Sequence, residues 1–275
     1  MRLRSVELEI PDVAAAAEFL ERLWGLMPAG ISGATRFFRG TGDHPYILSL
    51  TSASAPAVAA ITFAGSEDEI PNTDRSFDVP GGGRGYEVRG PENQNYRFIV
   101  DSKTESFKDR DKPMQLTHAV LNCIDVEACE RFAVETLGFK VSDRTAHMRF
   151  VRCNRKHHAL AYAKSDFASL NHIAFEMPSL DAVMRGIARL REAGYEPAWG
   201  PGRHGPGNNV FGYFIAPYGG VIEYTAEVSE VGDDYKVGTP EDWKWPPGRI
   251  DHWGLSKKDT AKTGPAERLF RFTAP

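Results

Sequence analysis

Leu3–Leu26 has the sequence LRSVELEIPDVAAAAEFLERLWGL, and Leu116–Phe139 has the sequence LTHAVLNCIDVEACERFAVETLGF. The two segments align without a gap at a shift of 113 residues. Asp12 and Asp125 stand where an aspartate caps the first turn of a helix, and a glycine follows each helical pattern at the place where a helix commonly ends. This internal repeat predicts two similar modules, each opening with a strand and a helix of about three turns.

The second copy contains the same unit again. Leu170–Met177 has the pattern of a strand, and Ser179 can cap a helix whose hydrophobic residues keep helical spacing as far as Leu190. Further short strands between turns are predicted at Met148–Arg152, Ala159–Ala163, Val210–Ile215 and Gly220–Thr225. The sequence therefore predicts an α+β fold in which strand, helix and three strands recur twice within a module.

The repeat also divides the chain. We expect an N-terminal module at residues 1–101, a charged linker at 102–112, a second module at 113–228 and an irregular C-terminal extension at 229–275. In the first module, Ala59–Phe63 resembles the Leu170 strand, but only the short acidic stretch Ser66–Glu69 stands where a helix would follow.

Composition restricts the class of protein. The 275 residues are 41% hydrophobic and 25% charged, as in ordinary globular proteins, and the net charge of −4 gives no reason to expect a nucleic-acid partner. The apolar stretch Ala55–Gly65 is too short to span a membrane, and the first residues lack the apolar core of a signal peptide. Three cysteines without a CxxC pair favour a reduced, cytoplasmic setting.

Histidines are concentrated in the second half of the chain, where seven of the eight follow residue 113. His118 and His172 each occupy the third position of an opening strand, and Glu223 lies between hydrophobic residues in the last strand. Two imidazoles and one carboxylate are the ligand set of non-haem Fe(II) oxygenases. Spacing alone equally allows two core histidines and an edge-strand glutamate.

Six short motifs carry a more specific resemblance. They are LTH ending at His118, RCNRKHH ending at His158, LNHIAFE around His172, GRH ending at His204, GYFIAPYG around Tyr213 and VIEY around Glu223. Together they resemble the type I extradiol ring-cleaving dioxygenases of the 2,3-dihydroxybiphenyl 1,2-dioxygenase kind, which belong to the vicinal oxygen chelate superfamily. The resemblance covers nearly the whole chain and is strongest from residue 116 to residue 225.

The resemblance implies a fold and an activity. The fold would be two vicinal oxygen chelate modules, similar to glyoxalase and bleomycin-resistance proteins, each forming a curved, barrel-like mixed sheet. The activity would be extradiol cleavage of a catecholic aromatic compound, with both atoms of O2 incorporated at a mononuclear Fe(II) centre, or with Mn(II) in its place. Family members are usually oligomers, so a homo-oligomer is expected, with no nucleic-acid or membrane partner.

The resemblance also implies roles for eight residues. The metal ligands would be His118, His172 and Glu223. The acid/base histidine beside the oxygen site would be His158, and the residues that bind the substrate hydroxyls and assist proton transfer would be His204 and Tyr213. The residues that line the ring pocket would be Val120 and Phe150.

The first module offers an internal comparison. Aligning the two copies places Ser5, Ala60 and Arg97 opposite the three expected ligands. These residue types cannot form a divalent-metal site, so only the second module is expected to hold metal. Two alternatives share the scaffold: a metal-dependent isomerase or lyase of the glyoxalase kind, whose sites normally use four protein ligands, and a metal-free binding protein.

Overall fold

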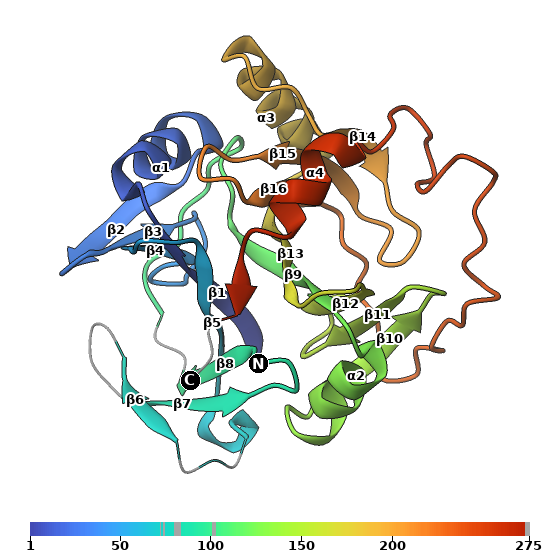
Figure 1. Cartoon of the computed structure of the whole chain (residues 1–275), viewed down its shortest axis with the longest axis horizontal. Helices are drawn as coiled ribbons and strands as arrows, with labels where there is room; N and C mark the ends of the chain where they lie inside the picture. Colours follow the sequence, from blue (N-terminus) through green and yellow to red (C-terminus); the bar gives the residue numbers. More distant parts are fainter. Residues whose placement is uncertain (72, 74, 80–83, 101–102, 273–275) are drawn as a thin grey trace.

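The computed structural model describes residues 1–71, 73, 75–79, 84–100 and 103–272. Within these residues, two mixed β-sheets with few helices make up the molecule, so the predicted α+β class is confirmed (Figure 1). The expected boundary between module and linker falls at residues 101 and 102, which lie outside the described residues. No helix in the described part of the chain is long and apolar enough to cross a membrane.

The first sheet comes mainly from the first module. Its described strands are β1 (Arg2–Ile10), β2 (Met27–Ser32), β3 (Thr35–Arg39), β4 (Leu48–Ser52), β5 (Ala57–Gly65), β6 (Ser76–Asp78), β7 (Arg84–Arg89), β8 (Asn95–Val100) and β17 (Arg271–Phe272). They are ordered β2-β3-β4-β1-β5-β8-β7-β6, with β17 beside β5. The central pair β1 and β5 is antiparallel, whereas β4 and β8 run parallel to β1 and β5 respectively.

The second sheet repeats this arrangement. Its strands are β9 (Gln115–Cys123), β10 (Lys140–Arg144), β11 (Met148–Arg152), β12 (Leu160–Lys164), β13 (Ser169–Glu176), β14 (Trp199–Arg203), β15 (Val210–Ile215) and β16 (Val221–Ala226). They are ordered β10-β11-β12-β9-β13-β16-β15-β14. The same mixture of parallel and antiparallel pairs recurs, so the predicted duplication is confirmed.

Three of the described helices begin where the sequence predicts. Helix α1 (Val13–Phe19) continues as the π-helix η1 (Leu20–Trp24), and the other helices are α2 (Val126–Glu135), α3 (Leu180–Glu192), α4 (Thr260–Glu267) and the short 3-10 helix η2 (Glu67–Glu69). Asp12, Asp125 and Ser179 accept hydrogen bonds from backbone amides in the first turns of α1, α2 and α3. Each such cap typically contributes about 1 kcal/mol.

Two strands of the second module and part of the extension were not located from the sequence. Strands β10 and β14 have no alternating pattern, and pairing with β11 and β15 sets their conformation. The extension, expected to be irregular, contains α4 and β17. Asp259 caps α4, and β17 pairs with β5 of the first sheet.

Each strand of the second sheet presents alternate residues to two different environments. On β16, Tyr224 faces α3 and the first module, where its ring stacks on Trp24 at 3.7 Å and its hydroxyl donates to the Trp24 carbonyl. The adjacent residue, Glu223, therefore faces the opposite side of the sheet. Helix α3 packs on the Tyr224 side, which leaves the Glu223 side for the cavity described below.

The strand register of the two sheets tests the alignment of first-module residues with the three expected ligands. One row of paired residues crosses the three central strands of each sheet. In the second sheet this row is His118, Ala174 and Glu223. In the first sheet it is Ser5, Thr62 and Arg97. The predicted equivalence of the two copies is therefore present in the strand pairing. The Arg97 guanidinium pairs with Glu7 at 2.6 Å and with Glu87 at 3.4 Å, an ion-pair cluster in place of a ligand set.

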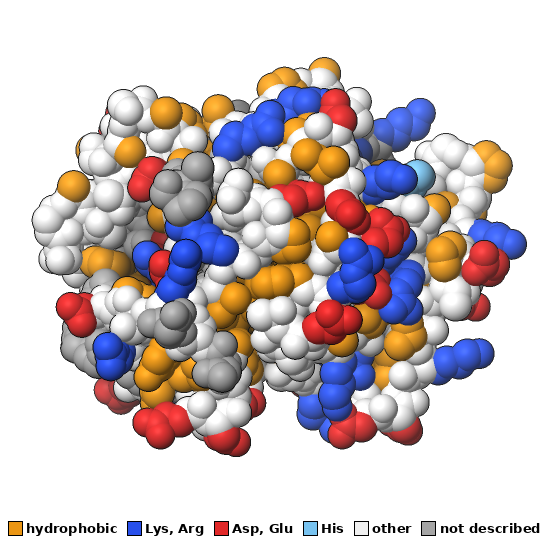
Figure 2. All heavy atoms as spheres, turned by 60° about the horizontal axis from the view of Figure 1, so that its bottom comes forward, with side chains coloured by type: hydrophobic (Ala, Val, Ile, Leu, Met, Phe, Trp, Pro, Cys, Tyr) orange, Lys and Arg blue, Asp and Glu red, His pale blue; other side chains and the backbone are white. Residues whose placement is uncertain are grey.

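The surface carries charges of both signs. On the face shown in Figure 2, Lys and Arg side chains lie among Asp and Glu side chains, with hydrophobic side chains between them.

The three cysteines, Cys123, Cys129 and Cys153, are free thiols.

Candidate active site

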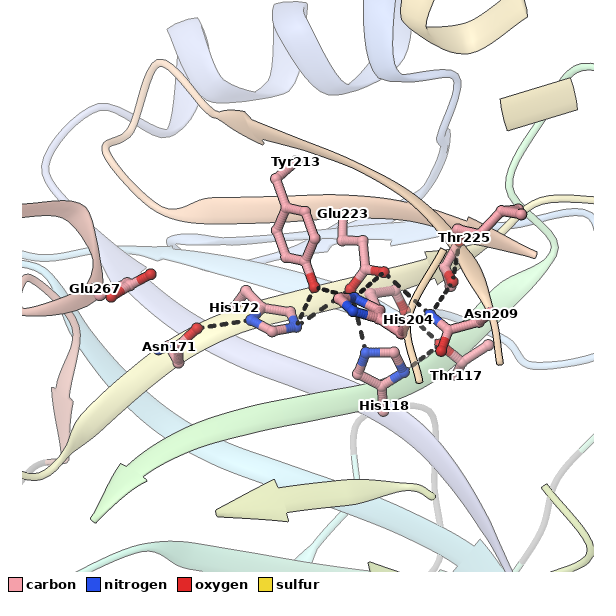
Figure 3. Close-up of polar contacts among 12 residues, drawn as sticks. Thr117, His118, Asn171, His172, His204, Asn209, Tyr213, Glu223, Thr225 and Glu267 are labelled. Atoms are coloured by element: carbon pink, nitrogen blue, oxygen red, sulfur yellow. Dashed lines mark hydrogen bonds and ion pairs between the residues drawn. The ribbon is translucent and has the colours of Figure 1, made fainter. Parts of the chain in front are cut away.

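Three side chains from three neighbouring strands converge on one point (Figure 3). His118 comes from β9, His172 from β13 and Glu223 from β16. Each imidazole Nε2 lies 3.2 Å from the same Glu223 oxygen, Oε2. The potential ligand atoms all lie within 4.8 Å of one another, and the side chains are buried. The structure thus brings together the three residues expected to bind metal.

The residue before each histidine fixes the orientation of its ring. Thr117 Oγ1 lies 2.9 Å from His118 Nδ1, and Asn171 Oδ1 lies 2.7 Å from His172 Nδ1. Thr117 Oγ1 also donates to a backbone carbonyl, and Asn171 donates its amide to Asn122, so both oxygens are left to accept from the rings. Each imidazole therefore carries its proton on Nδ1 and presents the Nε2 lone pair to the convergence point, as a metal ligand must.

Burial makes the site favourable for a cation. It lowers the pKa of His118 to about 3 and that of His172 to about 4, so both rings are neutral near pH 7. Burial also raises the pKa of Glu223, because an ionised carboxylate loses its hydration there. A divalent cation would supply the charge that two neutral imidazoles cannot, so the donor set fits such an ion.

Asn209 holds the carboxylate from the other side. Its amide donates to Thr225 Oγ1 at 2.8 Å and to Glu223 Oε1 at 3.4 Å. Among the described residues its Oδ1 atom is buried without a hydrogen-bond partner. The position of Asn209 restricts the Glu223 side chain to the conformation that faces both histidines.

His204 and Tyr213 lie directly beside the ligand cluster. The His204 Nε2 atom is 2.9 Å from the Tyr213 hydroxyl, which in turn is 3.5 Å from His172 Nε2. Burial raises the pKa of Tyr213 well above its usual value and lowers the pKa of His204 well below its usual value. Both groups are therefore neutral at pH 7, a phenol that can donate and an imidazole that can accept.

His158 borders the cavity next to His118. Its ring centroid is 4.2 Å from that of His118 and 5.2 Å from that of Phe150. Burial, followed by the nearby His118, lowers the pKa of His158 well below its usual value. Val120 and Phe150 pack together with Ala161 in a small apolar cluster next to this histidine.

A cavity of about 350 Å³ connects these groups. Seven of the eight expected site residues line it, and the eighth, Glu223, lies fully buried behind the two ligand histidines. The C-terminal extension contributes Trp245, Ile250 and Lys258 to the wall. Lys258 forms an ion pair with Glu267 at 2.6 Å. The extension therefore helps to enclose the cavity.

Sequence reasoning missed the residues that orient the ligands. Thr117, Asn171 and Asn209 are polar residues whose contacts only the folded sheet makes visible. A local signal was present for the first two, since a side chain with an acceptor oxygen precedes each ligand histidine in LTH and LNH. Asn209 had no such signal, because its partners are more than a dozen residues away in sequence.

Comparisons with known proteins agree with this geometry. The family model of the Glyoxalase/Bleomycin resistance protein/Dioxygenase superfamily matches residues 115–224, which include all three candidate ligands. A solved structure, the Mn(II)-bound glyoxalase from Novosphingobium aromaticivorans, is 30% identical and has a TM-score of 0.85. The likeness covers 95% of this chain and 93% of that one. The chain belongs to this superfamily.

Curated relatives of this chain include a metapyrocatechase and an extradiol dioxygenase. Metapyrocatechase 2 of Cupriavidus necator is 30% identical over 173 residues, which are 62% of this chain and 47% of that protein. The iron-dependent extradiol dioxygenase of Rhodococcus jostii is 29% identical over 135 residues, which are 43% of this chain and 45% of that protein. The matches thus span about half the length of these relatives.

Proposed function

We propose that the protein cleaves the ring of a catecholic compound in the extradiol manner. Both atoms of O2 enter the product, and the carbon–carbon bond beside the two hydroxyl-bearing carbons breaks to give an open-chain carboxylic acid with an aldehyde or ketone. The observation that carries this proposal is the cavity itself: a cluster of two imidazoles and a carboxylate opens into a space bordered by three groups that can handle protons.

His118, His172 and Glu223 would hold a single Fe(II) ion, with Mn(II) as the alternative. When bound, such an ion would supply a Lewis acid for oxygen ligands and the redox chemistry that amino-acid side chains lack. The name of the iron-dependent relative supports iron, and the Mn(II)-bound structure supports the alternative.

His204 and Tyr213 would bind the substrate hydroxyls. The Tyr213 phenol donates a hydrogen bond to one catechol oxygen, and the His204 imidazole accepts a proton at Nε2. Their mutual distance of 2.9 Å lets a proton pass between them. Because both lie next to His172, a catechol held by them lies directly against the metal ligands.

His158 would hold and move a proton at its Nε2 atom on the oxygen side of the cavity. Val120 and Phe150 would pack against the face of the aromatic ring, since apolar and aromatic walls are typical of small-molecule pockets. The enclosed cavity limits the access of water, which protects reactive species from side reactions.

A glyoxalase-like activity is the second candidate, because a solved structure that is 30% identical and matches 95% of the chain is a glyoxalase. Such sites normally use four protein ligands, often with two glutamates. Here the cluster that lies at the cavity, His118, His172 and Glu223, has a single carboxylate. The proton-handling groups beside this cluster are two histidines and a tyrosine, which suit a catechol better.

The test is to load the full-length protein with Fe(II) under anaerobic conditions and to follow oxygen uptake with a panel of catechols. We expect oxygen consumption in a one-to-one ratio with substrate and a yellow ring-opened product. In parallel, Fe(II)- and Mn(II)-loaded protein is given the thiol adduct of a 2-oxoaldehyde. Turnover of that adduct without any catechol turnover would replace the dioxygenase proposal with the glyoxalase one.

We further propose that the chain works as a homo-oligomer in the cytoplasm, divided into modules at residues 1–101 and 113–228 with the extension at 229–275. The free state of all three cysteines supports a reducing compartment. The two separate sheets support the division. Sedimentation of the metal-loaded protein tests the oligomeric state, and a monomer at working concentration would contradict it.

A further inference from the structure

A buried chain of three polar side chains runs away from the cavity behind His158. The His158 Nδ1 atom lies 3.0 Å from His157 Nδ1, and the His157 Nε2 atom lies 2.7 Å from Asp143 Oδ2. Asp143, His157 and His158 are 0%, 1% and 3% exposed. Neither Asp143 nor His157 had a role in the expected site, and neither lines the cavity.

The hydrogen-bond partners of Asp143 all donate to it. The backbone N–H of Gly238 donates to Oδ1 at 2.7 Å, and the Tyr235 hydroxyl lies 3.3 Å from both oxygens. A carboxylate surrounded by donors accepts from its remaining neighbour as well, so His157 carries its proton on Nε2. The Nδ1 atom of a neutral His157 is then an acceptor.

This polarity determines the proton position on His158. Because His157 Nδ1 accepts, His158 must donate from its own Nδ1 across the 3.0 Å contact. Among the described residues, this contact is the hydrogen bond of the His158 ring, and the ring borders the cavity. The Nε2 atom is therefore the unprotonated nitrogen and faces the cavity with its lone pair.

The C-terminal extension holds the hydrogen-bonded series Asp143, His157 and His158 in place. The backbone N–H of His157 donates to the Ser229 carbonyl at 2.8 Å, and Asp143 forms a β-bridge with Gly238. A Cβ atom at Gly238 would lie 2.5 Å from Asp143 Oδ1, so the close approach needs a glycine. The extension thus fixes the carboxylate as well as enclosing the cavity.

The first module has other residues at the positions of the three expected ligands, so it serves as a comparison. Phe37 pairs with Gly30 as Phe150 pairs with Asp143, and Ile47 N donates to Phe38 O as Ala159 N donates to Val151 O. The positions equivalent to Asp143, His157 and His158 are therefore Gly30, Pro45 and Tyr46. The ring contact of Phe37 with Tyr46, at 4.7 Å, matches that of Phe150 with His158.

All three hydrogen-bonded residues are thus replaced in the module that also lacks the ligands. A packing role would be needed equally in both modules, since the surrounding strands and the ring contact are kept. The three hydrogen-bonded residues are absent where the metal ligands are absent, as expected of residues that serve the metal site.

We propose that Asp143 and His157 are positioning residues that lock His158 in the tautomer with its proton on Nδ1, so that Nε2 is free to take up and return a proton at the reacting substrate. The proposal rests on the dioxygenase function for its catalytic consequence, but the tautomer itself is a property of the folded chain.

The decisive variant is Asp143→Asn. The Gly238 N–H requires an acceptor, so the new amide oxygen faces Gly238 and the amide nitrogen faces His157. An amide donor at His157 Nε2 reverses the direction of the hydrogen bonds. His157 then donates from Nδ1, and His158 carries its proton on Nε2. A wrong tautomer of this kind disables a proton-transfer histidine without removing it.

Two readouts are combined. Long-range proton–nitrogen NMR correlations on isotope-labelled histidine, recorded on the Zn(II)-loaded full-length chain, report which nitrogen of His158 is protonated, and a His158→Gln sample assigns its signals. Steady-state kinetics on the Fe(II)-loaded protein report kcat and KM. The matched control is Asp233→Asn, the same substitution at an exposed aspartate of the extension whose partner is Lys140.

We expect Nδ1 protonation in the wild type and in Asp233→Asn, and Nε2 protonation in Asp143→Asn. We expect kcat of Asp143→Asn to fall about 10²-fold, with KM for catechol within about twofold of wild type. Nε2 protonation in the wild type overturns the proposal even if the variant does not fold. A variant that changes the tautomer without losing kcat, or loses kcat without changing the tautomer, also overturns it. A wild type that cleaves no catechol contradicts the proposed function. The tautomer measured in the wild type still shows whether Asp143 and His157 hold the proton of His158 on Nδ1.

Discussion

Thr117→Val tests whether the residue before a ligand histidine supports metal binding. Valine has nearly the shape of threonine but lacks the oxygen that lies 2.9 Å from His118 Nδ1. Thr117 is 5% exposed, so water does not readily replace it. The His118 Nδ1 proton loses its acceptor, and the tautomer that presents Nε2 to the ion is no longer favoured.

The magnitude follows from known effects of such supporting residues. Removing the partner of a metal-bound histidine typically weakens metal binding by about 10–100-fold, which corresponds to roughly 1.4–2.7 kcal/mol. Leaving a buried donor unpaired also lowers the free energy of unfolding of the metal-free protein by about 1–3 kcal/mol. Both effects are expected in Thr117→Val.

The assay is competition for Zn(II) with a chromophoric chelator, together with chemical unfolding of the metal-free protein. Thr62→Val is the matched control, because Thr62 is equally buried and donates to Glu7 at 2.8 Å in the module without ligands. It should lose stability while keeping wild-type metal affinity. Wild-type metal affinity in Thr117→Val would mean that His118 does not depend on Thr117 to bind metal.

Three further predictions concern the ligand, the proton-handling histidine and a surface ion pair. Glu223→Ala is expected to lose the metal ion, and metal analysis showing a full complement would argue against Glu223 as a ligand. His158→Gln should keep the ion but lose turnover by about 10²–10⁴-fold, and undiminished oxygen uptake would remove His158 from the reaction. The hydrogen bond from Arg2 lowers the pKa of Asp43 below 3.8, so this pair contributes stability above that pH and loses it as the pH falls through the folded-state value. Asp43→Asn should therefore unfold at lower denaturant at pH 7, by less than about 1 kcal/mol, and match the wild type near pH 2; an equal gap at both would contradict this.

The sequence was sufficient for the features that repeat. The alignment at a shift of 113 residues predicted the duplicated sheets, and the helix caps Asp12 and Asp125 are local signals that a single turn decides. The register that sets His118 against Glu223 follows from the same repeat, because equivalent strands pair in the same way.

Contacts between distant segments could not be predicted in this way. The extension reaches Asp143 through Tyr235 and Gly238, more than ninety residues further along the chain. Strand β14 has the sequence WGPGR, which resembles a turn, yet pairing with β15 makes it a strand. Such features depend on the assembled sheet and have no local pattern.

A single turnover of the Fe(II)-loaded protein with a catechol under heavy-isotope dioxygen, followed by mass spectrometry of the ring-opened product, tests the dioxygenase activity itself. We expect both oxygen atoms of one O2 molecule to appear in that product. A product with label from one atom only, or a catechol recovered intact with no oxygen consumed by fully Fe(II)-loaded protein across the panel, would contradict it.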